Sequence, residues 1–390
     1  MSDNKNLKPG WKVWRFDQMA TNVNARIDNP SESGMEHYVG LEHLDADSLK
    51  IRRWGTPDDV EATKLMFKKG DIIFGRRRAY QRKLGVAEFD GICSAHAMVL
   101  RAKPDVVFPE FLPFFMQSDL FMNRAVEISV GSLSPTINWK TMAAQEFVLP
   151  PVEEQLRIVS LLSQFELQTE SYNDALVELG KLKKSLAQTE FVESDLPAVP
   201  LNQLCDKSGI QIGPFGAQLH SYDYVADGIP VVMPADMTNG IVVLDRIARV
   251  SEAKVSELKQ HTIRQGDILL PRRGELDRRA WVSEVEEGWL CGTGSIRIRV
   301  SDGVNPRAVF YALSMPTTVS WLKANAVGTT MPNLNSKIVA SIPIKLPRPE
   351  RVNDVVNALD DLDTSGRELN SRRQAASELK SQLLNRLWGG

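Results

Sequence analysis

The sequence predicts an α+β protein with two tandem globular domains, each followed by a long helix. The chain of 390 residues is longer than one common domain of about 150 residues. Its composition, 43% hydrophobic and 25% charged, is typical of globular proteins and fits disordered, collagen-like or membrane chains poorly. The observation that decides the domain number is an internal repeat.

Three features occur in both halves of the chain at a nearly constant spacing of 196 to 198 residues. They are residues 70–73 with Arg76-Arg77 and residues 266–269 with Arg272-Arg273, the pattern G-[ST]-x-x-P-x-[IL]-N-x-K starting at Gly131 and at Gly328, and the cysteines Cys93 and Cys291. Chance does not keep three separate features in register, so the chain holds two copies of one domain.

Residues 1–150 form the first predicted domain and residues 196–347 the second. Short β-type runs broken by Gly, Pro and Asn predict strands in both. These strands are expected at residues 71–74, 98–101, 268–270 and 296–300. A short apolar helix is predicted after Pro109 and after Pro306.

Each domain ends at a Leu-Pro pair, and a stretch without proline follows at 152–194 and at 352–389. These stretches predict long helices within the regions 151–195 and 348–390. The central one has a heptad seam, with steps of four and three residues: Leu161, Phe165, Gln168, Tyr172, Ala175, Leu179, Leu182 and Leu186. The terminal one has a less regular stripe: Val352, Val355, Leu359, Leu362, Leu369, Ala376, Leu379, Leu383 and Leu387.

At 1.5 Å per residue each helix reaches roughly 60 Å, more than a domain needs for its own core. We therefore predict that the two helices pair with each other as an antiparallel coiled coil, which gives the chain an internal pseudo-twofold repeat. Two separate helical hairpins are the alternative, with Gly180 and Gly366 as the positions where a turn could form.

The charge of the chain is nearly balanced, at -2, but basic residues gather locally. Residues 68–83 contain seven basic side chains against Asp71 alone, and the matching segment 264–279 contains five arginines against three acidic residues. Guanidinium groups suit phosphates and the O6/N7 edge of guanine. We predict DNA contacts for Arg76, Arg77, Arg78, Arg82, Lys83, Arg272, Arg273, Arg278 and Arg279. A solvated charge run is the alternative.

Motifs of the common enzyme classes are missing from the sequence. It contains no phosphate-binding loop, no zinc-protease or serine-hydrolase motif and no convincing dinucleotide fingerprint, and its five histidines fall singly. We therefore predict no catalytic residue, no metal site and no cofactor bound by this chain. The three cysteines lack CxxC spacing, and neither a signal peptide nor a membrane-spanning segment is expected. We expect a cytoplasmic protein.

Several repeated residues have structural interpretations. Asp71 and Asp267 are expected to cap backbone amides in a tight turn, and Cys93 and Cys291 to be small buried side chains. Asn138 and Asn335 either cap the chain or contact DNA. Residues 212–216, Ile-Gly-Pro-Phe-Gly, form either a turn near the second binding face or a packing turn.

Taken together, the segments resemble a known family. Two variable globular segments are each followed by G-[ST]-x-x-P-x-[IL]-N and Leu-Pro, and residues 150–159 read Pro-Pro-Val-Glu-Glu-Gln-Leu-Arg-Ile-Val. This arrangement resembles the specificity subunit of type I restriction-modification enzymes over nearly the whole chain. Residues 38–43, 213–216 and 228–231 also resemble segments of that family's target recognition domains. Residues 348–351, Arg-Pro-Glu-Arg, depart from the family's frequent Pro-x-x-Glu-Gln.

The resemblance implies a non-catalytic subunit that reads a split, asymmetric sequence in double-stranded DNA, one half per recognition domain. The helices would space the domains and bind two methyltransferase subunits. S-adenosylmethionine, ATP and Mg are expected on the methyltransferase and restriction/translocase subunits. Alternatives are a stand-alone DNA-binding protein, a coiled-coil scaffold without nucleic acid, a specificity subunit of a fused nuclease-methyltransferase system, and an enzyme in its own right.

Overall fold

The computed structural model describes residues 7–328 and 332–388, and the chain divides into two compact units. Unit 1 comprises Met1–Asp174 and Leu369–Gly390, and unit 2 comprises Ala175–Glu368. Each unit contains one predicted globular domain and a part of each long helix. Thr329 of the second repeated motif lies outside the described residues.

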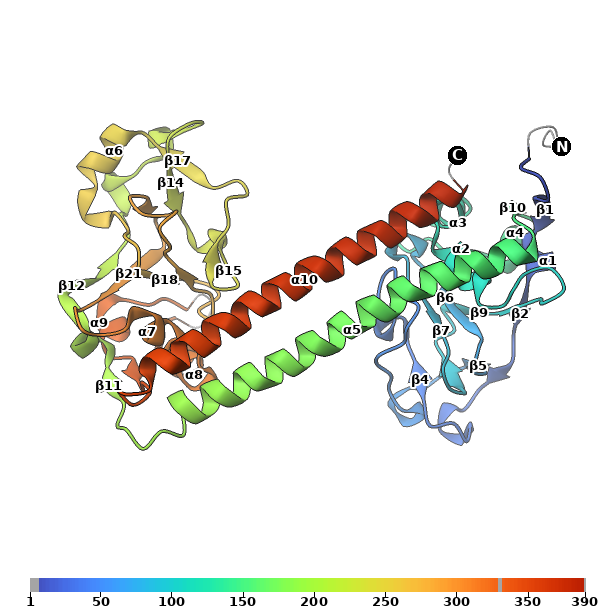
Figure 1. Ribbon diagram of the computed structural model, residues 1–390, viewed down its shortest axis with the longest axis horizontal. Coiled ribbons are helices and arrows are strands. Elements are labelled where there is room, and N and C mark those ends of the chain that lie inside the picture. The colour runs from blue at the N-terminus through green and yellow to red at the C-terminus, as the bar shows by residue number, and fades with distance from the viewer. Residues whose placement is uncertain (1–6, 329–331, 389–390) are drawn as a thin grey trace. The chain divides into compact units, whose positions relative to one another are not determined.

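Unit 1 is built on two sheets (Figure 1). The first has the order β2-β9-β6-β7 and the second the order β3-β5-β8-β4. Their bounds are β2 Ala20–Val23, β9 Ala97–Ala102, β6 Ile72–Gly75, β7 Leu84–Val86, β3 Arg26–Ile27, β5 Lys64–Phe67, β8 Gly91–Cys93 and β4 Tyr38–Val39. A separate strand pair joins β1 (Lys12–Arg15) to β10 (Glu146–Leu149), with α1 (Phe16–Met19) directly after β1. The helices α2 (Phe111–Gln117), α3 (Asp119–Glu127) and α4 (Trp139–Ala143) complete the domain.

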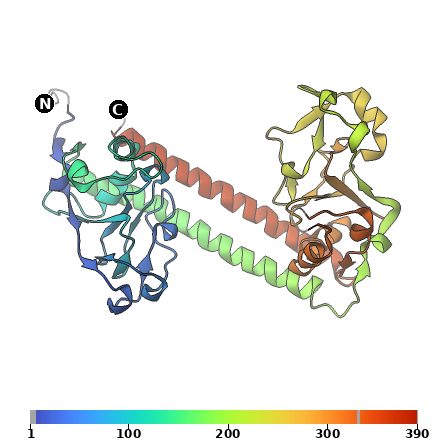
Figure 2. The ribbon, with the colours of Figure 1, turned by 180° about the vertical axis from the view of Figure 1, so that it is seen from behind.

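Unit 2 repeats the first sheet of unit 1, whereas its second sheet has another strand order (Figures 1 and 2). Its sheets have the orders β12-β21-β18-β19 and β13-β17-β14-β20. Their bounds are β12 Cys205–Ile212, β21 Ser295–Val300, β18 Ile268–Pro271, β19 Ala280–Trp281, β13 Tyr224–Val225, β17 Ala248–Val250, β14 Ile229–Val232 and β20 Leu290–Cys291. The parallel pair β14-β20 matches β4-β8, but β14 lies inside its sheet where β4 lies at the edge. The smaller pairs are β11 (Val199–Pro200) with β22 (Pro343–Ile344) and β15 (Met237–Thr238) with β16 (Ile241–Val242). Its helices are α6 Glu252–Glu257, α7 Pro306–Ala312, α8 Pro316–Asn325 and α9 Ser336–Ala340.

The strand register confirms that the repeat is structural. Ile72 pairs with Leu100 in unit 1, and Ile268 pairs with Ile298 in unit 2. The predicted strands correspond to β6, β9, β18 and β21, and the short helices predicted after Pro109 and Pro306 are α2 and α7.

The Gly-Asp turn before the central strand has the predicted capping role in both units. The carboxylates of Asp71 and Asp267, each 1% exposed, accept hydrogen bonds at 2.8 Å from the backbone N–H of Lys68 and Arg264. Each also forms an ion pair that sequence reasoning missed, to Arg101 at 2.7 Å and to Arg299 at 2.6 Å. A buried carboxylate requires such partners, because an unpaired buried charge is costly. The turn therefore joins β6 to β9, and β18 to β21, through side chains as well as through the strand ladder.

The two long helices are α5 (Val152–Phe191) and α10 (Val352–Trp388). Both continue through Gly180 and Gly366, so helical hairpins with turns at these glycines are excluded. The predicted heptad seam of α5 is wrong at two of its leucines. Leu161 and Leu182 are 44% and 58% exposed, because the neighbouring positions Ile158 and Leu162 face the core of unit 1 instead, and Ala187 faces that of unit 2.

The end of α10 contributes to the core of unit 1. Leu384 is buried there, and Trp388 packs against Phe111 and Phe115 at ring-centroid distances of 5.7 and 5.4 Å. The predicted stripe position Leu379 is 55% exposed, while the adjacent Lys380 is buried. The Lys380 ammonium takes this inward position because it forms an ion pair with Glu166 and donates to Gln117 Oε1 at 2.7 Å.

In unit 2, the beginning of α10 packs on α7 through a polar cluster. The Tyr311 hydroxyl donates to Asp360 Oδ1 at 2.6 Å, with Asp363 Oδ2 at 3.0 Å. Arg307 pairs with Asp360 at 2.6 Å, and Lys183 of α5 pairs with Asp363. Among residues 7–328 and 332–388, no helix combines the length and apolar character needed to cross a membrane.

Candidate nucleic-acid interface

In each unit the arginine pair after the central strand lies against the second repeated motif. In unit 1, Arg77 forms a β-bridge with Thr136, and the backbone carbonyl of Arg76 accepts a hydrogen bond from Ile137 at 3.0 Å. In unit 2, Arg273 bridges Asn333, and the carbonyl of Arg272 accepts from Leu334 at 2.8 Å. The arginine pair and the G-[ST]-x-x-P-x-[IL]-N-x-K motif, which are separate in the sequence, therefore form one structural element, an arginine pair held on a loop.

The loop itself is closed by a second bridge. Val130 and Thr136 exchange backbone hydrogen bonds of 3.0 Å, and Val327 and Asn333 do the same at 3.0 and 2.9 Å. Because this bridge fixes both ends of the loop, the arginines rest on a defined backbone rather than on a free coil.

Two of the three arginine side chains in the first group meet at one serine. Arg77 Nη2 and Arg78 Nη2 donate to Ser134 Oγ at 3.1 and 3.2 Å, and Arg76 Nη2 donates to the Ala95 carbonyl at 3.2 Å. In the part of the chain that the structure describes, none of the three guanidinium groups forms an ion pair with a carboxylate. Burial and the charge of Arg77 lower the pKa of His96, whose Nε2 lies 3.3 Å from Arg77 Nη1. The local potential is therefore positive.

Arg82 and Lys83, also predicted to contact DNA, are bound within unit 1. Arg82 pairs with Asp47 at 2.5 Å and with Asp119 at 3.0 Å, and it donates to the Gln117 carbonyl at 2.6 Å. Lys83 Nζ donates to the Leu41 carbonyl at 2.6 Å. Two carboxylates offset the charge of Arg82, so Arg76, Arg77 and Arg78 are the arginines of this segment that have no carboxylate partner among the described residues.

The four arginines of unit 2 that are predicted to contact DNA also fall into two pairs, one engaged within the unit and one available. Arg273 is exposed and Arg272 is half-buried. Arg278 pairs with Glu275 at 2.6 Å. Arg279 packs over the ring of Phe310 at 5.4 Å, and burial lowers its pKa to about 10. Arg272 and Arg273 are therefore the counterparts of Arg76 and Arg77 in position and in availability.

The other repeated residues have mostly structural roles. Asn335 Oδ1 caps α9 by accepting from the Ile338 N–H at 2.9 Å, whereas Asn138 precedes α4 without such a bond. Burial raises the pKa of Cys93 and of Cys291 to about 12, as expected for small core side chains. A Cβ on Gly213 would lie 2.0 Å from the Gly292 carbonyl, so the glycine loop passes directly over a neighbouring chain segment.

Sequence reasoning missed Ser134 and His96, the two polar partners of the arginine group. Both are far from Arg77 along the chain, although Ser134 occupies a variable position of the repeated pattern. The signal that could have revealed Ser134 is its position, because it is a polar residue inside the repeated motif.

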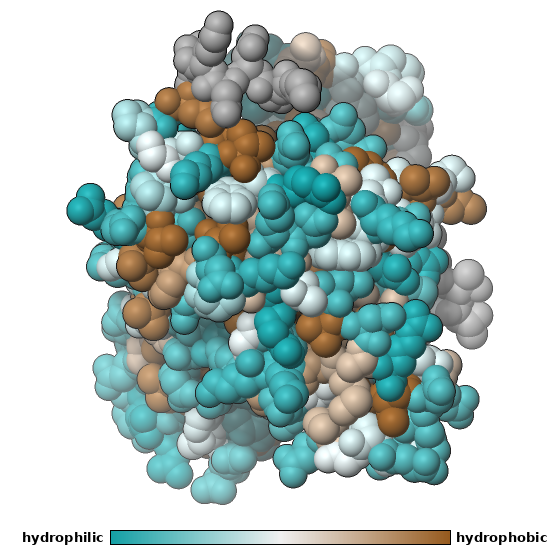
Figure 3. Space-filling model, turned by 90° about the vertical axis from the view of Figure 1, so that its right-hand side faces the viewer, coloured by the Kyte–Doolittle hydropathy of each residue, from teal (hydrophilic) through white to brown (hydrophobic). Residues whose placement is uncertain are grey.

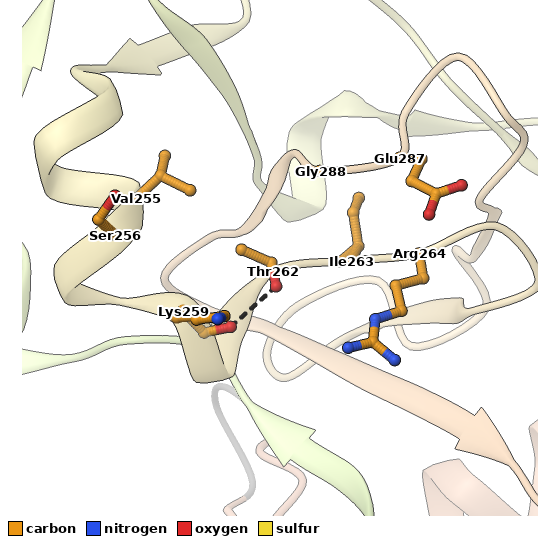
Figure 4. Close-up of a pocket in the computed structure, with 8 residues that line it drawn as sticks. All are labelled: Val255, Ser256, Lys259, Thr262, Ile263, Arg264, Glu287 and Gly288. Atoms are coloured by element: carbon orange, nitrogen blue, oxygen red, sulfur yellow. Dashed lines mark hydrogen bonds between the residues drawn. The ribbon is translucent and has the colours of Figure 1, made fainter.

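Two other features of the chain are its surface and a cavity of unit 2. Figure 3 shows hydrophilic residues over most of the face that it presents, with hydrophobic ones in small groups. In unit 2, a hollow of about 460 Å³ lies between α6 and the loop before β20, with Lys259, Arg264 and Glu287 around it (Figure 4). Over residues 7–328 and 332–388, no group of three or more His, Cys, Asp or Glu side chains is arranged to hold a metal ion.

A comparison with known protein families decides the relationship. The family model described as type I restriction modification DNA specificity domain matches residues 33–180 and 201–378, which is one copy in each half of the chain. The chain belongs to this type I specificity family.

Similar members of the family include two subunits from different organisms. The chain is 27% identical to the type I restriction enzyme EcoDI specificity subunit of Escherichia coli over 187 residues, 46% of this chain and 41% of that subunit. The alignment thus spans less than half of the length of this relative. It is 21% identical to the MjaVIII specificity subunit of Methanocaldococcus jannaschii over 323 residues, 77% of this chain and 74% of that subunit.

Solved structures share the fold. The type I restriction-modification S subunit from M. genitalium superposes with a TM-score of 0.63 at 16% identity, covering 100% of this chain and 98% of that one. A chain reported for complex assembly and conformational transition of the type I R-M system gives a TM-score of 0.55 at 22% identity, covering 98% of both chains.

Proposed function

We propose that this chain is the non-catalytic specificity subunit of a type I restriction-modification system, and that each unit reads one half of a bipartite, asymmetric DNA target. The observation that carries the proposal is the arginine pair on its closed loop, which occurs once per unit without a neutralising carboxylate among the described residues. Family membership supports the same function. Because the variable segments of the two units differ in sequence, the two half-sites should differ as well.

The long helices support a spacing role within this function. In unit 1, Asn173 and Arg373 are joined at 3.1 Å, and Glu166 pairs with Lys380; in unit 2, Lys183 pairs with Asp363. Residue numbers rise along one helix as they fall along the other, which favours an antiparallel coiled coil. Its length would then set the number of base pairs between the half-sites.

The partner subunits follow from the same proposal. Two methyltransferase subunits would bind along the helices, where Leu167, Val177 and Leu182 are exposed on α5. S-adenosylmethionine belongs to these subunits, and ATP and Mg to restriction/translocase subunits. The cytoplasm is the proposed location, supported by the three cysteines, all of them free and buried.

Selection from a random duplex library with the full chain tests the proposal. The wild type should enrich two short sequence blocks separated by a fixed gap. Changing Arg76, Arg77 and Arg78 together to alanine should relax only one block, by about 1–3 kcal/mol for each arginine that touches a base, or reduce the salt slope by about one for each arginine that touches a phosphate. The same change at Arg272 and Arg273 should affect only the other block.

The matched control is Arg53→Ala, which removes an exposed arginine of unit 1 whose partner is Asp45. This variant should enrich both blocks as the wild type does. Equal decreases in affinity in the control and in the triple variant would show a general effect of charge. Methyl transfer by the purified chain alone would contradict a non-catalytic subunit.

A further inference from the structure

A small polar pocket adjoins the first arginine group. It has a volume of about 160 Å³ and lies entirely in unit 1, where β2, β5, β6 and β9 approach the start of α4. Its apolar floor includes Met98, which is 2% exposed. Five polar side chains surround the floor: Asn22, Asn24, Arg26, Thr63 and Arg76. We call this site the Arg76 pocket.

The Arg76 pocket is rich in hydrogen-bond donors, because Arg26 and Arg76 both line it and a guanidinium group only donates. Asn24 Oδ1 accepts from Arg26 Nε at 3.2 Å. The Ala95 carbonyl accepts from Arg76 Nη2 at 3.2 Å. Arg76 Nε is buried and has no partner among the residues that the structure describes. No carboxylate stands among the described residues that line the pocket. A complementary ligand therefore presents acceptors.

The repeat shows which part of this site differs between the units. Asn22 pairs with Leu100, and Ile210 pairs with Ile298, which occupies the place of Leu100 in unit 2. Ile210 therefore stands where unit 1 has Asn22. Because alternate strand residues share a face, Ile212 likewise stands for Asn24. Two residues further along the chain, Pro214 corresponds to Arg26.

The arginine is thus the same in both units, whereas the strand that faces it differs between them. Arg272 takes the position of Arg76, but the residues across from it are apolar in unit 2 and polar in unit 1. Phosphates are the same in every DNA sequence, so a pocket for a phosphate has no reason to differ between the units. Base edges do differ between half-sites.

We propose that the Arg76 pocket reads a guanine of the first half-site, with Asn22, Asn24 and Arg26 as specificity-determining residues. Guanine presents two acceptors, N7 and O6, on its major-groove edge, and a guanidinium fork matches them. Adenine presents one acceptor and one donor there, and a guanidinium fork, which only donates, cannot match that donor. This inference rests on the proposed function, because it assigns a base to the same DNA-binding site.

The test combines library selection with a modified base. The wild-type chain should select guanine at one position of the first block, and 7-deazaguanine at that position, which lacks the N7 acceptor, should weaken binding about tenfold. The double variant Asn22→Ile/Asn24→Ile should lose the guanine preference at that position. It should keep the second block and the salt slope unchanged. Arg26→Ala, at an exposed position, gives a second variant that leaves β2 intact.

The reciprocal variant Ile210→Asn/Ile212→Asn is the matched control, and it should change base preference only in the second block. A uniform decrease of affinity for all sequences in the double variant of Asn22 and Asn24, or the same decrease in Arg26→Ala with the salt slope reduced by about one, would show a phosphate contact and overturn the inference. An unchanged first block would overturn it as well. A wild type that selects no sequence blocks would instead refute the proposed function itself, so the two failures are distinguishable.

Discussion

Leu384→Ala tests whether the last turns of α10 complete the core of unit 1. Leu384 is 3% exposed and lies among the aromatic and aliphatic side chains of that core. Truncating a buried leucine to alanine costs about 2–5 kcal/mol, and the cost is lower where neighbours can close the cavity. Leu384 is close to the end of a helix, which can shift inward. We therefore expect about 2–3 kcal/mol, equivalent to about a 30- to 150-fold change in an opening equilibrium.

Hydrogen exchange measured by mass spectrometry separates the two units in one experiment. In Leu384→Ala, peptides from β9 of unit 1 should exchange faster by that factor, while peptides from β21 of unit 2 should not change. Leu379→Ala is the matched control, because it removes the same side chain from the same helix at a position that is 55% exposed. Its effect should stay within about 0.5 kcal/mol. Equal effects of the two variants, or faster exchange in β21, would refute the assignment of this segment to unit 1.

Three further predictions concern thiols, a buried ion pair and the helix length. Burial raises the pKa of Cys93 and Cys291 to about 12, so both thiols stay protonated at pH 8 and a colorimetric thiol reagent should label neither until the protein is denatured; rapid labelling of the native chain would contradict their burial. Asp267→Asn removes the ionic partner of Arg299 and should destabilise unit 2 by about 1–3 kcal/mol, measured as faster exchange in β18 with β6 unchanged. Seven residues inserted after Leu179 and after Ala376 would lengthen each helix by roughly 10 Å, about three base pairs, so selection should recover the same half-sites with a longer gap; recovery of the original gap at full affinity would refute the spacing role.

The strands β6, β9, β18 and β21, the short helices α2 and α7 and the long helices α5 and α10 could be predicted from the sequence, because they depend on local patterns that the repeat presents twice. The heptad seam of α5 could be predicted only in part. A heptad assignment assumes that a helix faces one partner along its whole length. Leu162 instead faces a globular core, which turns Leu161 outward. Such a choice between neighbouring leucines depends on tertiary packing.

The candidate site could likewise be predicted from the sequence only in part. The arginines could be found from their repetition, but their availability depends on residues distant in sequence. Asp47 and Asp119 neutralise Arg82, and Ser134 gathers Arg77 and Arg78. The Arg76 pocket also needed the strand register, since Asn22 meets the central strand only through β9, the strand between them.

The placement of Leu384 and Trp388 in the core of unit 1 affects how the protein is synthesised. Unit 2 is one continuous segment, Ala175–Glu368, whereas unit 1 needs residues from both ends of the chain. At about 5–20 residues per second, a ribosome needs roughly 10–40 s to reach the end of α10 after finishing residue 174. During that time Phe111 and Phe115 lack the indole ring that covers them in the finished protein. The half of the protein that leaves the ribosome first is therefore completed last.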